Sequence, residues 1–241
     1  MYKFTKKSVI ISCGGGVVGD VSALASSLYL RGLIYFHIPT TMTAIVDSCI
    51  GGKTGINYKG IINSLGNYYY PKNVYILENI INLIPDREYL AGIPEVIKCG
   101  LIDSVKTLNF LKKNKKQIIS RNFSYVSKMC RLALETKIKF FAKDVYEKNL
   151  RLNLNFGHTF AHAIEMTLEK HLNSLNIRHG EAVGIGILCE LYYAFQKKNK
   201  IFHETKKILE DYSLPTKLNG KKIKNNKQML QSVIYKNIFL D

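Results

Sequence analysis

Residues 9–20 read VIISCGGGVVGD, and this segment indicates the fold class more clearly than any other part of the chain. Residues 9–12 have the character of a buried strand, and apolar residues continue at helical spacing from Val21 to Tyr29. A strand, a glycine turn and a helix start form an anion site, because glycine lets backbone N–H groups approach a phosphate and the helix dipole favours negative charge there. A tight turn without a ligand is the alternative, and three consecutive glycines favour the phosphate.

A second apolar run, residues 33–38, follows the expected helix and ends at Pro39-Thr40-Thr41. Strand, helix and strand in this order are the unit of a parallel sheet, and residues 74–77 are a candidate for a third strand. The threonine hydroxyls would then face a ligand at the carboxyl edge of the sheet. We therefore predict an α/β N-terminal part, a truncated Rossmann-like parallel sheet, over residues 1–85.

After residue 85 the pattern changes to long helical periodicity. We predict an all-α C-terminal domain over residues 86–241, with a polar linker at 217–226 and a last segment at 229–241 that is a helix or a strand. The expected helices cover residues 88–102, 105–119, 123–141, 159–168, 180–198 and 203–212.

The composition excludes several classes of protein. The net charge of +17 comes from 35 Lys+Arg against 18 Asp+Glu, but the lysine-rich runs at 112–116 and 221–227 lack the interleaved aromatic residues of a nucleic-acid platform. We therefore expect no nucleic-acid partner. An acidic small substrate could explain the charge, and a compositional drift towards Lys, Asn, Ile and Tyr, which needs no partner, is the alternative. Five scattered cysteines without a CxxC pair indicate a reducing compartment. No apolar run is long enough for a membrane span or a signal peptide, so we expect a cytoplasmic protein without a membrane partner.

A Gly-Gly-Lys-Thr string at residues 51–54 invites a P-loop interpretation. The Walker A motif needs a glycine where Asp47 stands, so we reject a nucleoside-triphosphate site. Lys53, beside a flexible glycine pair, is still well suited to hold a phosphate or carboxylate as a point charge.

Histidines point to a metal. Residues 155–165 read NFGHTFAHAIE, and a helix there places His158 and His162 on one face, one turn apart. His179 precedes another apolar run and could be directed back at them. Three protein ligands with an open position is the arrangement of catalytic zinc, and satisfied structural histidines are the alternative. Glu95, in the segment PEVIK, either forms a surface salt bridge with Lys98 or joins two histidines as a carboxylate ligand.

Six motifs occur in one order between residues 14 and 188: GGGVVGD, RG followed six residues later by PTT, VDSCIGGKTGIN, PEVIK, NFGHTFAHAIE and HGEAVGIG. In these motifs the chain resembles the 3-dehydroquinate synthase family, the NAD- and zinc-dependent sugar-phosphate cyclases of the shikimate pathway. The resemblance implies a dehydroquinate synthase-like fold, related to that of iron-containing alcohol dehydrogenases. Residues 1–85 would form a partial NAD-binding α/β domain, and residues 86–241 a helical metal- and substrate-binding domain.

The resemblance also implies roles for single residues. It makes Glu95, His158 and His179 the ligands of zinc, with cobalt as an alternative, and His162 a substrate-side group instead of a ligand. The NAD cofactor would contact Gly15, Gly16, Val17, Asp20, Thr40, Thr41 and Asp47. The substrate would contact Arg31, Lys53, Asn63, Lys98, Lys137, Arg151, Asn155 and His162, of which all but Arg31 and Asn63 would be catalytic. For Lys137 alone, a helix-surface lysine is the alternative.

The implied activity is the conversion of 3-deoxy-D-arabino-heptulosonate 7-phosphate to 3-dehydroquinate and phosphate by a carbon–oxygen lyase. The chain departs from the family where Ile62 replaces a lysine. It also lacks the family's segments before the glycine-loop strand and after Asp241, so we expect a truncated synthase, acting as a homodimer. The alternatives are a sister cyclase for another sugar phosphate and an inactive remnant of the fold. A zinc-dependent alcohol dehydrogenase is less favoured, because a site rich in lysine and arginine suits a phosphorylated acid.

Overall fold

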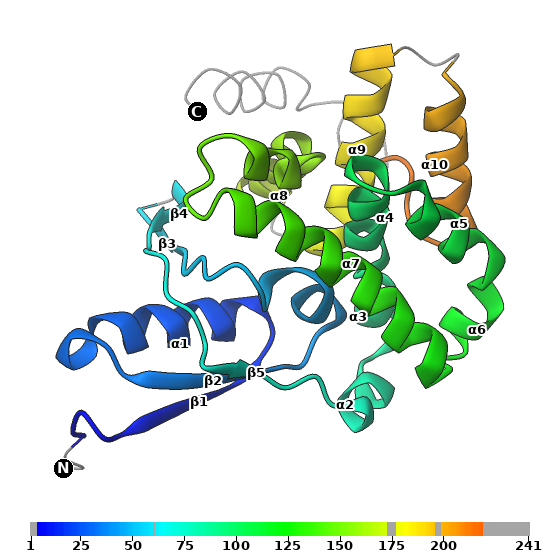
Figure 1. Ribbon diagram of the computed structural model, residues 1–241. Coiled ribbons are helices and arrows are strands. Elements are labelled where there is room, and N and C mark those ends of the chain that lie inside the picture. Colours follow the sequence, from blue (N-terminus) through cyan, green and yellow to red (C-terminus); the bar gives the residue numbers. More distant parts are fainter. Residues whose placement is uncertain (1–3, 60, 173–176, 196–198, 219–241) are drawn as a thin grey trace.

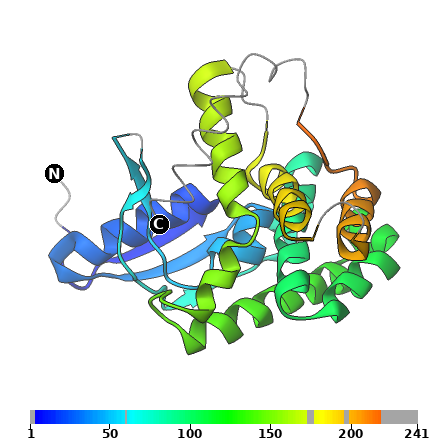
Figure 2. The same ribbon diagram turned by 90° about the horizontal axis from the view of Figure 1, so that it is seen from above.

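The computed structural model describes residues 4–59, 61–172, 177–195 and 199–218. A small sheet region formed by the N-terminal third of the chain lies beside a larger helical region (Figures 1 and 2). The predicted segments at 229–241 and 219–226 fall outside the described residues. None of the helices in the described ranges is long and apolar enough to cross a membrane.

The sheet consists of three parallel strands in the order β1 (Val9–Gly14), β2 (Ile34–Pro39) and β5 (Asn73–Val74). Helix α1 (Gly16–Leu28) connects β1 to β2, followed by a short 3-10 turn, η1 (Tyr29–Arg31). α1 packs closely on β2, because a Cβ atom at Gly19 would come within 3.0 Å of the His37 ring. The predicted strand, glycine turn, helix and strand are therefore present. The first strand is not buried as predicted, because Val9 and Ile11 are exposed, and the third strand is shorter than residues 74–77 and begins one residue earlier.

The sheet is covered on one face. Ser12 of β1 and Tyr35 and His37 of β2 are buried beneath α1, whereas Ile11 and Ile34, which point the other way, are exposed. Figure 1 shows α1 above the strands, and among the described elements none lies below them. Parallel sheets are ordinarily buried on both faces, so this sheet has an uncovered apolar side.

A hairpin and a π-helical turn of the N-terminal part had no counterpart in the sequence prediction. An antiparallel hairpin joins β3 (Ile56–Tyr58) and β4 (Ile61–Leu65). A π-helical turn, η2 (Ala44–Ser48), follows β2, and its Ile45 and Val46, with Met42 just before it, belong to the core of the helical region. The turn thus links the two regions.

The helical region is built around α4 (Ile93–Ile102), which is buried at every position from Ile93 to Gly100. Residues of the other helices, such as Leu111, Met129 and Ile208, complete the core. The remaining elements are α2 (Glu78–Leu83), α3 (Asp86–Leu90), α5 (Val105–Lys113), α6 (Lys115–Ile119), α7 (Phe123–Lys143), η3 (Leu150–Asn155), α8 (His158–Leu172), α9 (His179–Phe195) and α10 (Lys200–Asp211).

Two of the predicted helices were too long. The helix expected over 88–102 is divided into α3 and α4 at Ala91-Gly92, where Pro94 in the first turn of α4 has no backbone N–H to continue a preceding helix. The helix expected over 105–119 is divided at Asn114, whose side-chain amide donates to the Phe110 carbonyl at 2.9 Å and ends α5. The other predicted helices are present with shifted ends, and α2 and η3 were not predicted.

Candidate metal centre and cationic site

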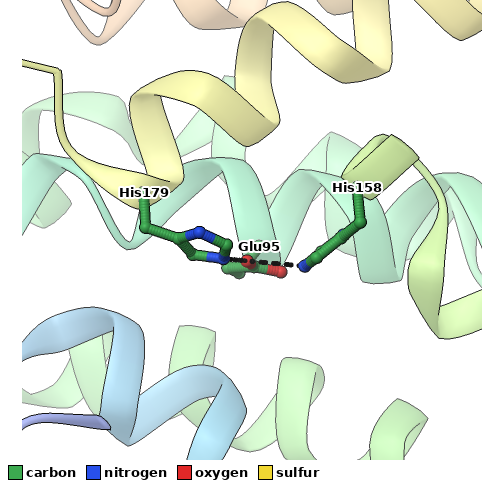
Figure 3. A group of neighbouring side chains, drawn as sticks. All are labelled: Glu95, His158 and His179. Atoms are coloured by element: carbon green, nitrogen blue, oxygen red, sulfur yellow. Dashed lines mark ion pairs between the residues drawn. The ribbon is translucent and has the colours of Figure 1, made fainter. Parts of the chain in front are cut away.

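Three side chains from three helices of the helical region meet at one place (Figure 3). Glu95 lies in the first turn of α4, and His158 and His179 are the first residues of α8 and α9. Nε2 of His158 is 3.7 Å and Nε2 of His179 is 3.5 Å from Oε1 of Glu95. The three candidate ligand atoms all lie within 4.8 Å of one another. Side chains 63 and 84 residues away from Glu95 in the sequence are thus close enough to share one cation.

Small residues allow this convergence. Gly157, with φ +86°, turns the chain into α8 in a conformation that favours glycine. Its carbonyl oxygen would lie only 2.0 Å from a Cβ atom at Gly186, so α8 and α9 touch backbone to backbone. Because each helix begins with a candidate ligand, this contact sets the distance between the two imidazoles.

The donor set fits a divalent cation. Glu95 is fully buried, and its Oε1 has no hydrogen-bond partner within the described ranges. Burial would raise the pKa of Glu95, but the Lys98 ammonium opposes this and the pKa falls to about 2. Burial and Lys98 lower the pKa of His158 to about 3, which leaves its imidazole neutral. A charged carboxylate and neutral imidazoles are the ligands that zinc uses in mixed oxygen and nitrogen sites.

The outer nitrogens of both histidines are held in place. Nδ1 of His179 is 3.0 Å from Oε1 of Glu165, and Nδ1 of His158 is 3.3 Å from the Phe156 carbonyl. Such contacts fix the tautomer and direct Nε2 to the shared space. Burial alone would lower the pKa of His179, but the carboxylates of Glu165 and Glu95 raise it to about 10. The metal-free imidazole therefore holds a proton that a metal ion would displace from Nε2 when it binds. Sequence reasoning missed Glu165, although it lies in the quoted histidine motif.

His162 lies beside this group without being part of it. Its ring centroid is 5.6 Å from that of His158 and 6.2 Å from that of His179. The three-residue group with ligand atoms in mutual reach consists of Glu95, His158 and His179. The geometry therefore leaves His162 next to the cation position.

Two buried lysines connect the metal centre to η2. Nζ of Lys98 is 2.6 Å from Oε2 of Glu95 and 3.3 Å from Oδ1 of Asp47, and Nζ of Lys137 is 2.9 Å from the same Asp47 oxygen. Burial would raise the pKa of Asp47, but both ammonium groups hold it well below its usual range. Neither lysine is exposed, so the surface alternatives for Lys98 and Lys137 are wrong.

A second cationic cluster lies along the loop before η3. Lys53 forms an ion pair with Glu147, and the Asn155 amide donates to Oε1 of Glu147 at 2.7 Å. The Arg151 guanidinium donates to the carbonyls of Gly51 and Val145 at 2.8 and 2.7 Å. Sequence reasoning missed Glu147, whose carboxylate here contacts two of the residues expected to bind an anionic substrate.

The glycine turn lies between β1 and α1, with residues of the β2–η2 connection packed against it. A Cβ atom at Gly15 would come within 2.9 Å of Thr41, and one at Gly16 within 3.4 Å of Ser48. No side chain caps the N-terminus of α1 among the described residues, which leaves its first N–H groups available to an anion. Val17 is exposed at this end of the helix.

Asp20, one turn further along α1, lines a small pocket together with Lys53, His37 and Ser48. Burial and the nearby Asp47 raise the pKa of Asp20 to about 6. Thr40 follows β2, and its backbone N–H donates to the Gly14 carbonyl at 2.9 Å. The structure thus gathers the predicted cofactor residues around the start of α1.

Two predicted substrate residues lie apart from these clusters. Arg31 is exposed and follows the C-terminal end of α1, whereas the glycine turn is at the N-terminal end. Asn63 is on strand β4, where its backbone N–H donates to Oδ1 of Asn57 at 3.0 Å and its side chain faces Gly55. The roles predicted for these two residues are not supported by a contact with the other site residues in the described ranges.

The fold is shared with known sugar-phosphate cyclases. One is ValA, a 2-epi-5-epi-valiolone synthase from Streptomyces hygroscopicus, solved with NAD+ and Zn2+ bound. The TM-score is 0.83 and the sequence identity 22%, and the match covers 96% of this chain and 63% of that chain. Another is a 2-deoxy-scyllo-inosose synthase complexed with carbaglucose-6-phosphate, NAD+ and Co2+, with a TM-score of 0.77 at 23% identity over 96% of this chain and 62% of that chain. At this identity the likeness defines the class of fold.

The sequence comparison defines the family. The model of the 3-dehydroquinate synthase N-terminal region matches residues 1–91, and the model of its C-terminal region matches residues 92–236. A 3-dehydroquinate synthase from Dictyoglomus thermophilum is 45% identical over 193 residues, which are 79% of this chain and 53% of that protein. The chain belongs to the 3-dehydroquinate synthase family, as the motifs predicted. It spans about half the length of this curated relative.

Proposed function

We propose that the chain carries 3-dehydroquinate synthase activity, the conversion of 3-deoxy-D-arabino-heptulosonate 7-phosphate to 3-dehydroquinate and phosphate. The observation that carries this proposal is the meeting of Glu95, His158 and His179 next to two buried lysines. Membership of the family and the names of its curated relatives support it. The division into residues 1–85 and 86–241 remains our proposal, and the two family models meet close to it, between residues 91 and 92.

Zinc, with cobalt as an alternative, would be held by Glu95, His158 and His179. When bound, the ion would polarise and orient the oxygen atoms of the reacting carbon centre. The related cyclases solved with Zn2+ or Co2+ support the choice of metal. In the protein, Glu165 would keep His179 in the tautomer that leaves Nε2 free for the ion.

NAD would lie at the start of α1, where it would contact Gly15, Gly16, Val17, Asp20, Thr40, Thr41 and Asp47. When bound, it would accept a hydride from the substrate and return it later in the cycle. The glycines allow the pyrophosphate to reach backbone N–H groups, and the dipole of α1 favours its negative charge. NAD+ in the solved cyclases supports this assignment.

The substrate would be held by lysines, arginines and polar groups around the two cofactors. Burial would lower the pKa of Lys98, but Asp47 and Glu95 face it and raise the pKa, so Lys98 would keep its positive charge. Lys137 lies beside it, paired with the same Asp47 carboxylate. Fixed cations in a buried site stabilise a leaving phosphate without having to reorganise. Lys53, Arg151, Asn155 and His162 would complete the catalytic group, with Arg31 and Asn63 as further substrate contacts.

The test is release of inorganic phosphate from the heptulosonate phosphate by the purified chain with zinc and NAD+. We expect formation of 3-dehydroquinate, and we expect its loss in Glu95→Gln and in His158→Ala. Binding of zinc and NAD+ without phosphate release would mean an inactive remnant of the fold. Release from other sugar phosphates only would mean a sister cyclase.

Three further assignments complete the proposal. All five cysteines are free thiols, as in proteins of reducing compartments, and we place the protein in the cytoplasm. We expect a homodimer, which mass photometry can check, and no nucleic-acid partner.

A further inference from the structure

A buried carboxylate in the first turn of α9 is held by an arginine from α3. The Arg87 guanidinium donates from Nε to Oε1 of Glu181 at 2.7 Å and from Nη2 to Oε2 at 2.8 Å. Both oxygens of one carboxylate are thus engaged by one planar group, the geometry in which Arg and carboxylate bind most strongly. The two residues are 94 positions apart in the sequence, so the pair fixes one helix against another.

The same carboxylate also defines where α9 begins. Oε2 of Glu181 accepts the backbone N–H of Arg178 at 2.9 Å, and the Arg178 carbonyl accepts the Ala182 N–H at 3.0 Å. A glutamate at the third helical position that bonds back to the residue before the helix is half of a capping box. Glu181 therefore fixes the residue between them, His179, at the first position of the helix.

Two further contacts join the start of α9 to the chain that leads into α4. The side chain of Arg178 forms an ion pair with Glu88 of α3. A Cβ atom at Gly180 would lie only 1.6 Å from the Ala91 carbonyl oxygen, so the backbones are in direct contact. Ala91 is followed four residues later by Glu95, the ligand from α4.

We propose that Arg87 is a positioning residue, which acts through Glu181 to hold His179 at the distance from Glu95 that a shared metal ion requires. In this role Arg87 acts on His179 through Glu181 and is not one of the three candidate ligands. This inference rests on the proposed metal centre.

The electrostatics support a firm contact. Glu181 is buried, which would raise its pKa, yet the hydrogen bonds from Arg87 and from the Arg178 backbone hold the pKa below its usual value. The pKa of Arg87 is raised, chiefly by its hydrogen bond to Glu181. Removing Arg87 would take two hydrogen-bond donors from a buried charge, and the first turn of α9 would relax.

The experiment measures zinc affinity by competition with a chelator in the wild-type chain and in three variants. We expect Arg87→Gln to weaken zinc binding by about 10- to 100-fold, the range found when a group that supports a metal ligand is removed. Arg87→Lys should lie between this variant and the wild type, since lysine keeps the charge but cannot bind both oxygens in a fork.

The matched control is Asp86→Asn. Asp86 is the neighbouring residue on α3, its side chain is 94% exposed, and it pairs with Arg121 instead of α9. Its removal should leave zinc affinity unchanged within about twofold, since exposed pairs contribute little. Equal zinc affinity in Arg87→Gln and Asp86→Asn would overturn the proposal.

A second measurement separates this inference from the proposed function. In the metal-free protein, hydrogen exchange of the Ala182 amide should be faster in Arg87→Gln than in Asp86→Asn, because its bond to Arg178 closes the first turn. A wild-type chain that binds no zinc would refute the metal centre and the positioning role with it, whereas faster exchange would still establish the tether between α3 and α9. Unchanged exchange together with unchanged zinc affinity would refute the tether as well.

Discussion

The sheet region and the helical region differ in how completely their apolar residues are buried. In α4 every residue from Ile93 to Gly100 is buried, and apolar side chains from seven further α-helices belong to the same core. In the sheet, Ile11 is 66% exposed and Val17, at the start of α1, is 79% exposed. All three candidate metal ligands lie in the well-buried helical region. The candidate cofactor turn lies in the more exposed sheet region. The metal centre should thus be the more robust of the two sites.

Charged residues show the same contrast. In the sheet region, Asp20 is partly buried, and burial and the like charge of Asp47 raise its pKa to about 6. In the link to the helical region, Asp47 faces two ammonium groups, and its pKa is held well below its usual range. Lysines of the helical region therefore compensate the charge of Asp47, whereas the pKa of Asp20 stays raised.

The largest effect should come from breaking the buried charge network of the helical region. Lys98→Met leaves Glu95 without its ammonium partner at 2.6 Å and Asp47 with Lys137 alone. We expect a loss of about 3–5 kcal/mol in the free energy of unfolding, as for other buried pairs that lose one member. Urea unfolding of the metal-free protein measures it. The control is Lys112→Met, which removes a half-exposed ion pair with Glu204 and should lower the free energy of unfolding by less than about 1 kcal/mol. Equal losses of stability in Lys98→Met and Lys112→Met would contradict the contrast between buried and exposed pairs.

A matched pair of isoleucines tests the burial contrast directly. Ile97 of α4 is 0% exposed and Ile11 of β1 is 66% exposed. Ile97→Ala should cost about 2–5 kcal/mol, because it removes buried methylenes and leaves a cavity. Ile11→Ala should cost under about 1 kcal/mol, since surface substitutions change little. A large cost for Ile11→Ala in thermal or urea unfolding would show that the outer face of the sheet is covered in solution.

Zinc affinity should depend on carboxylates of the helical region only. Glu165→Gln weakens the acceptor that holds Nδ1 of His179, and we expect zinc to bind about tenfold more weakly, or about 1.4 kcal/mol. Asp20→Asn, the same chemical change in the sheet region, should leave zinc affinity unchanged. Chelator competition compares the two, and a larger effect from Asp20→Asn would mean that the sheet region shapes the metal centre.

The smallest effect concerns the pH dependence of stability. A carboxyl group whose pKa is higher in the folded than in the unfolded chain adds stability below its unfolded value and loses it as the pH rises through the folded value. For Asp20 this window runs from about 4 to about 6. Asp20→Asn should thus match the wild type below pH 4 and become more stable above pH 6, on the order of 1 kcal/mol because Asp20 is partly exposed.

For Asp47 the sign is opposite: its contribution is present above about pH 4 and is lost as the pH falls further, so Asp47→Asn should be less stable than the wild type at pH 7. Denaturant midpoints between pH 3.5 and 7.5 measure both.

The correct parts of the fold prediction came from patterns among neighbouring residues in the sequence. The strand before Gly14 and the helix after it follow from residues next to one another in the sequence, and so does the helical spacing around His158. The break at Ala91-Gly92 was missed because the apolar period continues across it, although Pro94 was a signal. The hairpin from Ile56 to Leu65 was missed because its exposed strands lack the alternation of a half-buried sheet.

The site was predicted from motifs, and its supporting contacts were not. Residue spacing suggested that Glu95 and two histidines could share a metal, but the choice of His158 and His179 over His162 came from the family's motifs. Contacts such as Arg87 with Glu181 join residues 94 positions apart, and no spacing within one element encodes them. They depend on how α3 and α9 pack, which in turn depends on the whole core.

The contact between the Gly157 carbonyl and Gly186 has a consequence for protein engineering. A single methyl group at residue 186 would overlap that carbonyl, at 2.0 Å, and force the helix axes of α8 and α9 apart. Selectivity among cations depends on cavity size. Small substitutions at this crossing could therefore tune which ion the protein prefers while every coordinating atom stays the same.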